Sequence, residues 1–595
     1  MALSASSSLL LLIVVMHVYL LNFGIGLDQV LTFWLPLEAA AFLVLFATIS
    51  SDQNWVLVLI LVFAATLHIV LPLRIGPNYP AGEDATFGYQ AVTQIMSSGQ
   101  WTTGVGTGSA NIVYSYFPMM FVFTALWAGI GSIPATIITN YAFPAVNLTA
   151  LLSVRMLTRS FGLSKKEANI VLFLYSLTPT IHQIESVFHY EAYAVIFFPI
   201  ALLYTMKPRI SMAERTIALF SILAVAFSHF FTALDLALYC TVLAATYLIL
   251  RGTRVNLDLA FLSVVIPLAW NAAVASSYFQ RQVLSTLDVL RHSRDILTLL
   301  NRVSPGATQL GANFYAAPWL AQTATARNLI IVVFSLIAIF TLCFGLSQSG
   351  IRIKRKDALT YMAVIWVFAL AFNGTAYFGV NWAQTSLGLG PSAAARITVF
   401  SFIPFAIFCG LGLYLVLNRL ELRIHGDKML LVKAVLCIVL IVIFTTSAVV
   451  QAYSRGFYDS TYHQVYYDEY ITWQQSSFLE PIYLGTWWSA ANNHTLASND
   501  PMAGSNGLRY FVEAYGYQGW WVDNVSSPYV AENSRLSSSF TVYYAFDTLN
   551  VQLPDHLYNA TLSPQFISSN DTKLNTIFNT GRLIVDFKPP QTFQA

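Results

Sequence analysis

The chain has 595 residues, of which 56% are hydrophobic and only 10% are charged. A soluble protein carries roughly 25% charged residues, so this composition excludes an ordinary water-soluble protein. The formal net charge of +2 gives no support to a nucleic-acid partner, because such partners select strongly basic surfaces. Stretches of about 18 or more apolar residues, each able to cross a bilayer core of roughly 30 Å, predict a polytopic α-helical membrane protein.

The apolar runs predict about thirteen membrane spans. They begin near residues 9, 30, 55, 133, 168, 189, 214, 231, 257, 328, 358, 396 and 429. The first run, residues 8–26, lacks a basic leading region and a small-residue cleavage site, so we interpret it as a retained span rather than a signal peptide. The four cysteines all fall inside apolar runs, which excludes a disulfide framework and argues against a zinc site.

Clusters of basic residues recur in alternate connections between the spans. They lie at residues 155–166, 207–215, 251–254, 352–356 and 419–428. Because cytoplasmic loops are enriched in Lys and Arg, we expect these connections to face the cytoplasm. The other connections then face outward, among them the long loops 74–132 and 277–327. The pattern is typical of a multi-pass protein of the cell membrane, with membrane lipids around it.

One further apolar run, residues 114–131, does not fit this alternation as a span. Only one crossing fits between an outer loop at 74–132 and an inner loop at 155–166, and residues 133–153 are the better candidate. We therefore expect the run to lie along the membrane or to re-enter it, anchored by its aromatic and Met-rich start. If the run does cross, the topology of everything before it inverts.

The tail, residues 451–595, contains few long apolar runs and is rich in Tyr, Trp, Asn and Ser. Alternating runs at residues 539–544 and 582–587 predict strands. Four Asn-X-Ser/Thr sequons favour an outer location only modestly, because sequons arise by chance. We expect two extra spans in residues 1–54, a transmembrane domain in residues 55–450, and a small α/β or α+β extracytoplasmic domain in the tail.

Ionisable residues near span ends are the candidates for function, because such residues are costly at membrane depth. The predicted outer face collects Glu83, Asp84, His189, Glu191, His229, Asp235 and Arg396. Acids, histidines and an arginine in one place suit a general base, an acceptor-binding group and a clamp for a phosphate anion.

Several candidates also have a purely structural interpretation. Asp84 fits the N-cap of a helix over residues 85–98, after a loop rich in Pro and Gly. His229 and Asp235 fit a hydrogen-bonded pair, because buried polar groups need partners. Arg396 fits a residue at a span end whose charge extends to the membrane surface.

The stretch from Asp84 to Trp101 resembles the first outer loop of the GT-C superfamily of membrane glycosyltransferases. In that superfamily an acid opens a helix beside the membrane, and the helix ends in a small-Gly-polar-Trp sequence. Here the ending is Ser98-Gly-Gln-Trp101. One departure is Ala85, which stands where many relatives carry a second acid, and another is the pair of extra spans at the start of the chain.

The resemblance continues along the chain in the order that the superfamily shows. An aromatic-Pro segment, Tyr116-Phe-Pro118, follows the first loop, and a Thr-Pro-containing span, residues 177–180, comes later. A second outer acid, Glu191, comes next. The resemblance covers residues 55 to about 250, and beyond that it depends on the number of spans and the outer tail.

The resemblance implies that residues 55–450 transfer a sugar from a polyprenyl (dolichyl) phosphate donor to a glycan, lipid or protein acceptor on the outer face. It implies an active site around Asp84 and Glu191. Asp84 is the expected base, and the adjacent Glu83 is a third candidate catalytic acid that also fits a solvated neighbour of Asp84. Arg396 is the expected phosphate clamp. The expected substrate-binding residues are His189, His229, Asp235, Arg396 and Tyr116. No cofactor is expected for this reaction.

Two alternatives stay open. An oligosaccharyltransferase of the same superfamily would use outer acids, with His189 and Glu191 as one pair, to hold a divalent metal such as Mg or Mn. Such enzymes carry a Trp-Trp-Asp-Tyr-Gly motif, whereas this tail has Trp487-Trp-Ser-Ala and Trp520-Trp-Val-Asp. A transporter is the non-enzymatic alternative, but the chain shows no convincing internal repeat and its acids gather at one surface.

Overall fold

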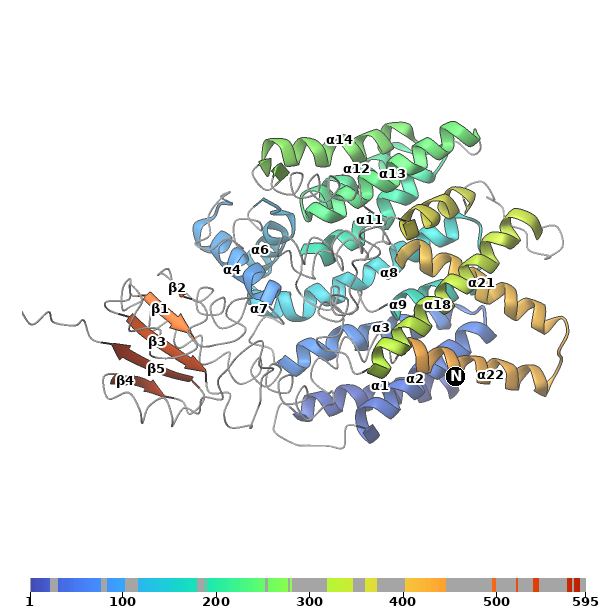
Figure 1. The fold of residues 1–595 in the computed structure, drawn as a ribbon, viewed down its shortest axis with the longest axis horizontal. Coiled ribbons are helices and arrows are strands. Elements are labelled where there is room, and N and C mark those ends of the chain that lie inside the picture. The colour runs from blue at the N-terminus through green and yellow to red at the C-terminus, as the bar shows by residue number, and fades with distance from the viewer. Residues whose placement is uncertain are drawn as a thin grey trace, which may run out of the picture. The chain divides into compact units, whose positions relative to one another are not determined.

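The computed structural model describes most of the helical part of the chain and the strands of its tail (Figure 1). The described residues are 2–21, 30–75, 83–101, 116–178, 188, 190–251, 255–276, 279–280, 318–345, 359–371, 402–445, 495–498, 521–522, 539–544, 575–579 and 583–588. The chain divides into two compact units. One contains residues 1–74 and 99–453, and the other contains residues 75–98 and 454–595.

The first unit is helical. Its helices are α1 (Ala2–Leu21), α2 (Leu35–Ser50), α3 (Asn54–Ile75), α6 (Met119–Gly131), α7 (Ala135–Ile137), α8 (Phe143–Ser160), α9 (Lys165–Ser176), α11 (Tyr190–Met206), α12 (Met212–Ala226), α13 (Phe230–Leu250), α14 (Leu257–Ala273), α18 (Pro318–Phe340), α21 (Phe402–Glu421) and α22 (Asp427–Thr445). A further helix covers Leu359–Ala371. Single π-helical turns, Val30–Trp34, Ile138–Ala142 and Thr341–Gly345, continue three of them.

Each predicted span coincides with one of these helices in the described residues. Six helical stretches of the described part are long and apolar enough to cross a membrane, so the protein is a multi-pass membrane protein. They are Leu31–Ser50, Ala135–Ser160, Phe230–Leu250, Ala326–Phe344, Phe402–Glu421 and Asp427–Thr445. Shorter apolar helices account for most of the other predicted spans, and the figure of about thirteen crossings stays a prediction.

Local sequence signals start two of the helices. At the start of α9, the Ser164 side chain accepts a hydrogen bond from the Glu167 backbone, and the Glu167 carboxylate accepts one from the Ser164 backbone. Ser211 and Glu214 form the same reciprocal pair at the start of α12. A cap of this kind contributes about 1 kcal/mol, and both caps lie within predicted cytoplasmic basic clusters.

Close helix crossings hold the centre of the helical unit together. Helix α21 packs against both α18 and α9, and α8 packs against α11. A Cβ atom on Gly412 would lie 1.9 Å from the carbonyl oxygen of Phe334 in α18. A Cβ on Gly410 would lie 2.6 Å from the side chain of Val171 in α9. Glycine at both positions therefore permits α21 to approach two neighbours at backbone distance.

Polar contacts join the connections that the basic clusters place on the cytoplasmic side. They are Lys165 Nζ with Asn54 Oδ1 (3.1 Å), Lys166 and Lys433 Nζ with Glu421 Oε1 (3.8 and 2.7 Å), and Arg215 with Asp258 (2.9 Å). Each contact links two chain segments that the predicted topology assigns to the same membrane surface. The packing and the charge pattern therefore agree on which helix ends lie together.

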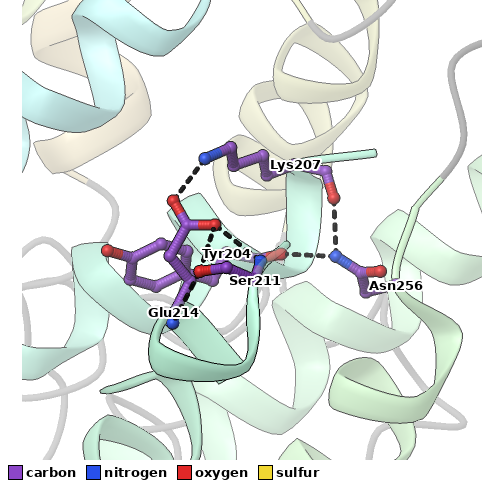
Figure 2. Close-up of polar contacts among 5 residues, drawn as sticks. All are labelled: Tyr204, Lys207, Ser211, Glu214 and Asn256. Atoms are coloured by element: carbon purple, nitrogen blue, oxygen red, sulfur yellow. Dashed lines mark hydrogen bonds and ion pairs between the residues drawn. The ribbon is translucent and has the colours of Figure 1, made fainter. Parts of the chain in front are cut away.

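The most connected of these junctions joins α11, α12 and α14 (Figure 2). Lys207 forms an ion pair with Glu214, whose carboxylate also accepts a hydrogen bond from the Ser211 backbone at 2.9 Å. The Asn256 amide donates to the carbonyl oxygens of Tyr204 and Lys207, at 2.8 and 2.5 Å. Asn256 thereby satisfies carbonyl groups that the end of α11 leaves without helical partners.

Two predicted boundaries differ from the structure in a way that the amino acids explain. Within the run 114–131, the helix α6 covers 13 residues and begins only at Met119, after the aromatic start of the run. The helix Leu359–Ala371, over a predicted span, is equally short, so the expectation that residues 114–131 do not cross the membrane stays a prediction. The predicted outer loop 277–327 ends inside a helix, because α18 begins at Pro318, before the apolar run starts.

The second unit combines α4 (Glu83–Ser98) with a five-stranded sheet. The strands are β1 (Thr495–Ser498), β2 (Trp521–Val522), β3 (Ser539–Tyr544), β4 (Asn575–Asn579) and β5 (Leu583–Lys588), in the order β2-β1-β3-β5-β4. β1 pairs in parallel with β2 and β3, whereas β5 is antiparallel to β3 and β4. The predicted strands at 539–544 and 582–587 coincide with β3 and β5. A mixed sheet suits the expected α/β or α+β tail, whose outer location stays a prediction.

Candidate active site

Two helices that begin on the predicted outer face bring two of the candidate acids together. Glu191 is the second residue of α11 and is 0% exposed. Asp235 lies in the second turn of α13 and is 5% exposed. The two helices pack together, and Glu191 is the charged group that acts on the Asp235 carboxyl. Both acids therefore lie near the starts of two packed helices, and their membership of one active site stays a prediction.

His229 sits at the start of α13, where its side chain serves as the N-cap. Its Nδ1 atom accepts a hydrogen bond from the Thr232 backbone at 3.3 Å and lies 2.7 Å from the Thr232 hydroxyl. Because Nδ1 is an acceptor here, the neutral ring carries its hydrogen on Nε2. The structural interpretation of His229 is therefore correct in that its side chain is hydrogen-bonded within the fold. The partner is Thr232 rather than Asp235.

An aromatic contact joins the starts of α11 and α13. The ring of Tyr190 packs on the ring of His229, with centroids 4.6 Å apart and planes tilted by 58°. Tyr190 immediately precedes Glu191, so the same contact fixes the position of the first turn of α11. His229, Tyr190, Glu191 and Asp235 all lie at the starts of α11 and α13, and we call these four residues the α11/α13 acid site.

The Asp235 carboxyl has an incomplete set of hydrogen bonds. Its Oδ2 atom is buried and receives no hydrogen bond from a donor among the described residues. An acceptor atom left in this state costs about 1–3 kcal/mol, so the arrangement is not explained by stability alone. Buried polar groups of this kind are typical of sites that bind a substrate or move a proton.

Tyr116 reaches the same end of the bundle through its backbone. The Trp270 indole donates to the Tyr116 carbonyl oxygen at 2.9 Å, and the Met119 backbone donates to the Phe227 carbonyl oxygen at 3.2 Å. Phe117 packs edge-on against Phe230, the first residue of α13, with ring centroids 6.5 Å apart. The aromatic-Pro segment therefore lies beside the start of α13.

The small-Gly-polar-Trp ending also connects to this region. Trp101 stacks on Phe121 of α6, with ring centroids 6.0 Å apart. Phe121 in turn packs edge-on against Phe188, two residues before Tyr190, at 6.3 Å. Aromatic contacts therefore link Trp101, within the first predicted outer loop, to the start of α11.

Several predicted site residues lie where the structure gives no side-chain detail. His189 and Arg396 fall outside the described residues. Glu83 and Asp84 are the first two residues of α4, and only their backbone is described. The alternative role of Asp84 as an N-cap is wrong, because α4 begins at Glu83 and Asp84 is its second residue. Its role as a base stays a prediction.

The sequence reading missed one buried cation, Arg327. It lies in α18, one residue after the start of the stretch Ala326–Phe344 that is apolar enough to span, and is 6% exposed. Its Nε and Nη2 atoms donate to Asn328 Oδ1 at 3.2 and 3.1 Å. The sequence feature that could have identified Arg327 is an arginine at the predicted outer boundary of a span, the same feature that singled out Arg396.

A metal site receives no support from the part of the chain that the structure describes. There, no group of three or more His, Cys, Asp or Glu side chains is arranged to hold a metal ion. His189, the partner of Glu191 in the divalent-metal alternative, lies outside that part. The need for Mg or Mn therefore stays a question for experiment.

Neither a protein-family model nor a curated protein matches the chain. Among solved structures, the chain is similar to the Archaeoglobus fulgidus oligosaccharyltransferase tethered with an acceptor peptide containing the NVT sequon. The match covers 83% of this chain and 69% of that one, with 13% identity and a TM-score of 0.49. ArnT from Cupriavidus metallidurans, bound to undecaprenyl phosphate, matches over 90% of this chain and 98% of its own, with 12% identity and a TM-score of 0.36.

Both neighbours are GT-C membrane glycosyltransferases, the superfamily that the sequence motifs resemble. Their TM-scores are below 0.5, so the likeness carries no argument about donor, acceptor or mechanism in this chain. Those questions depend on the residues of the chain itself.

Proposed function

We propose that this protein is a membrane glycosyltransferase that moves a sugar from a polyprenyl-phosphate donor to an acceptor on the outer face. The observation that carries the proposal is the α11/α13 acid site. Glu191 and Asp235 are buried together where two helices begin, beside His229 and Tyr190. Buried acids in a membrane protein are expensive and mark functional sites.

The proposed reaction needs few groups from the protein. The acceptor oxygen attacks C1 of the sugar, the bond from C1 to the phosphate oxygen breaks, and polyprenyl phosphate leaves with the bonding electrons. A base takes the acceptor proton, for which Asp84 is the candidate. A cation stabilises the charge that grows on the phosphate, for which Arg396 is the candidate.

Glu191 and His229 are suited to hold the sugar and the acceptor in this scheme. A carboxylate and an imidazole that carries its hydrogen on Nε2 offer an acceptor and a donor for sugar hydroxyl groups. A groove between membrane helices suits the long apolar chain of the donor. The aromatic rings of Tyr190 and Tyr116 are suited to pack on the face of a sugar ring.

The direct test is incubation of purified protein in nanodiscs with a panel of polyprenyl-phosphate sugars. We expect release of polyprenyl phosphate and transfer of the sugar for at least one donor in the presence of a hydroxyl acceptor. A parallel reaction with a lipid-linked oligosaccharide and a sequon peptide, with and without Mn²⁺, tests the oligosaccharyltransferase alternative. Uptake of the donor into proteoliposomes without cleavage would instead indicate a transporter.

A further inference from the structure

Two lysines from different helices share one carboxylate at the predicted cytoplasmic end of the helical unit. Glu421 ends α21, and its Oε1 atom lies 2.7 Å from Lys433 Nζ of α22 and 3.8 Å from Lys166 Nζ of α9. The ring of Tyr414, also in α21, lies 5.9 Å from Lys166 Nζ and adds a cation–π contact. We call Lys166, Glu421 and Lys433 the Glu421 cluster. One negative charge holds two positive charges in this cluster, which leaves one positive charge unbalanced.

Basic residues also outnumber acids in the chain segments that meet at the cluster. Six Lys or Arg residues and four Asp or Glu residues lie in the segments 51–54, 164–167 and 419–433. Of these acids, Asp52 also acts on Lys166, although no ion pair joins these two described residues. Glu167 is used to cap α9. The region therefore presents a surplus of positive charge.

The Glu421 cluster lies where a membrane span meets the lipid headgroups. Lys433 is in the second turn of α22, within the stretch Asp427–Thr445 that is long and apolar enough to span the membrane. Leu430 and Leu431, which precede it, are 55% and 65% exposed, and Leu422 is 65% exposed. A lysine this close to the end of a span extends its ammonium group toward the headgroups, while the leucines beside it contact acyl chains. A ligand of the cluster therefore meets both positive charge and apolar surface.

An anionic phospholipid matches both features of this surface. A soluble anion would complement the positive charge but leave the exposed leucines without a partner. A zwitterionic phospholipid would cover the leucines, but its headgroup carries a cation of its own. An anionic phospholipid supplies a phosphate and acyl chains without that cation, and basic surfaces between membrane helices on the cytoplasmic side bind such headgroups.

We propose that Lys166 and Lys433 bind the phosphate of an anionic phospholipid, and that Glu421 competes with this phosphate for the two ammonium groups. The bound lipid joins α9 and α22 beside the end of α21. The Glu421 cluster shares no residue with the α11/α13 acid site. The lipid site therefore does not depend on the proposed glycosyltransferase function.

Native mass spectrometry of the purified full-length protein in detergent tests lipid binding directly. The protein is titrated with dioleoyl phosphatidylglycerol, which is anionic, and separately with dioleoyl phosphatidylcholine, which is zwitterionic. We expect the Kd for phosphatidylglycerol to be at least about fivefold lower, the effect of one Lys or Arg near a membrane surface. Equal affinity for the two lipids would overturn the proposal.

Substitutions within the cluster should change the affinity in opposite directions. Lys433→Gln should weaken phosphatidylglycerol binding about fivefold, and Lys433→Arg, which keeps the charge, should retain it. Glu421→Gln should strengthen binding, because it removes the group that competes for the lysines. If Glu421→Gln weakens binding as Lys433→Gln does, the three residues form a structural ion-pair network and the proposal is wrong. Glu421→Gln and Lys433→Arg decide the question even where Lys433→Gln does not fold.

Arg209→Gln is the matched control for the loss of one positive charge. Arg209 is exposed in the connection between α11 and α12, and its replacement should leave the affinity for phosphatidylglycerol close to that of the wild type. An equal loss in Arg209→Gln and Lys433→Gln would indicate a general attraction of the charged surface. Displacement of the lipid by inorganic phosphate would indicate a site for a soluble anion. Either result would overturn the assignment to a phospholipid.

Discussion

At the scale of one residue, the buried acid Glu191 is expected to cost stability, so its role in the reaction can be tested separately from its role in the fold. An acid at membrane depth costs about 2.5–3.5 kcal/mol on insertion scales, yet Glu191 is 0% exposed in the first turn of α11. Removing its charge relieves that cost and also the repulsion with Asp235. A residue kept there for stability would give the opposite result.

We therefore expect Glu191→Gln to lower single-turnover transfer by roughly 10²- to 10⁴-fold, the range for loss of a charged catalytic group. Its thermal unfolding temperature should stay the same or rise, because a buried charge is removed. Glu38→Gln, which alters an acid of α2, is the matched control and should retain transfer. A drop in unfolding temperature with normal transfer would assign Glu191 to the fold.

Asp84 is tested separately, because its position in the first turn of α4 leaves its role as a base a prediction. Asp84→Asn preserves size, so the helix should form. We expect single-turnover transfer to fall by about 10²- to 10⁴-fold with little change in donor binding. Glu83→Gln is the neighbouring control and should cost much less. The reverse pattern would move the base to Glu83.

Two arginines are candidates for the clamp on the leaving phosphate. Arg396 is a candidate from its place in the sequence, and Arg327 is a candidate because it is buried. Replacing the true clamp with Lys keeps the charge but loses the two-pronged geometry of a guanidinium. We expect Arg396→Lys to weaken donor binding, measured with a fluorescent polyprenyl phosphate, and Arg396→Ala to weaken it more. If only Arg327→Lys and Arg327→Ala have this effect, the clamp lies on α18.

At the scale of elements, capping residues define where some helices begin, and close packing determines how other helices are placed. The capping boxes at Ser164 and Ser211 are readable as Ser-X-X-Glu in the sequence and define where α9 and α12 begin. The register of α21 depends instead on glycines that pack against distant helices. No local pattern distinguishes these glycines from others in apolar runs.

Gly412 provides a test of this packing. An added Cβ would lie 1.9 Å from the Phe334 carbonyl oxygen, so α18 and α21 must separate to accept it. We expect Gly412→Ala to destabilise the protein by about 1–3 kcal/mol, measured as a lower unfolding temperature in detergent. Gly129 in α6 has no atom within 4 Å of the same added group. Gly129→Ala should leave the unfolding temperature unchanged or raise it slightly.

At the scale of the whole molecule, two independent features agree on the topology. Basic clusters select one set of connections as cytoplasmic, and contacts such as Lys166 with Glu421 join members of that set. Contacts such as Met119 with Phe227 join the opposite set. Packing shows which ends lie together but not which side faces the cytoplasm, so the absolute direction depends on the charge pattern.

Cysteine labelling on intact cells tests that direction. A cysteine at Ser568 in the tail should react with an impermeant reagent, whereas one at Met212 should react only after lysis. Met212 is 79% exposed at the start of α12, so it is accessible and its replacement disturbs no core packing. Labelling of Met212→Cys but not of Ser568→Cys on intact cells would invert the topology and move the proposed active site to the cytoplasmic face.

The sequence by itself determined the membrane class, the position of nearly every described helix, two tail strands and the candidate acids. These features depend on local hydrophobicity, periodicity and charge, which each segment carries alone. Tertiary structure alone decided that the helices of Glu191 and Asp235 pack together, that His229 caps its own helix through Thr232, and that Arg327 is buried. Such pairings depend on how each helix is rotated and which neighbour it packs against, and apolar spans with little amphipathic character do not encode that rotation locally.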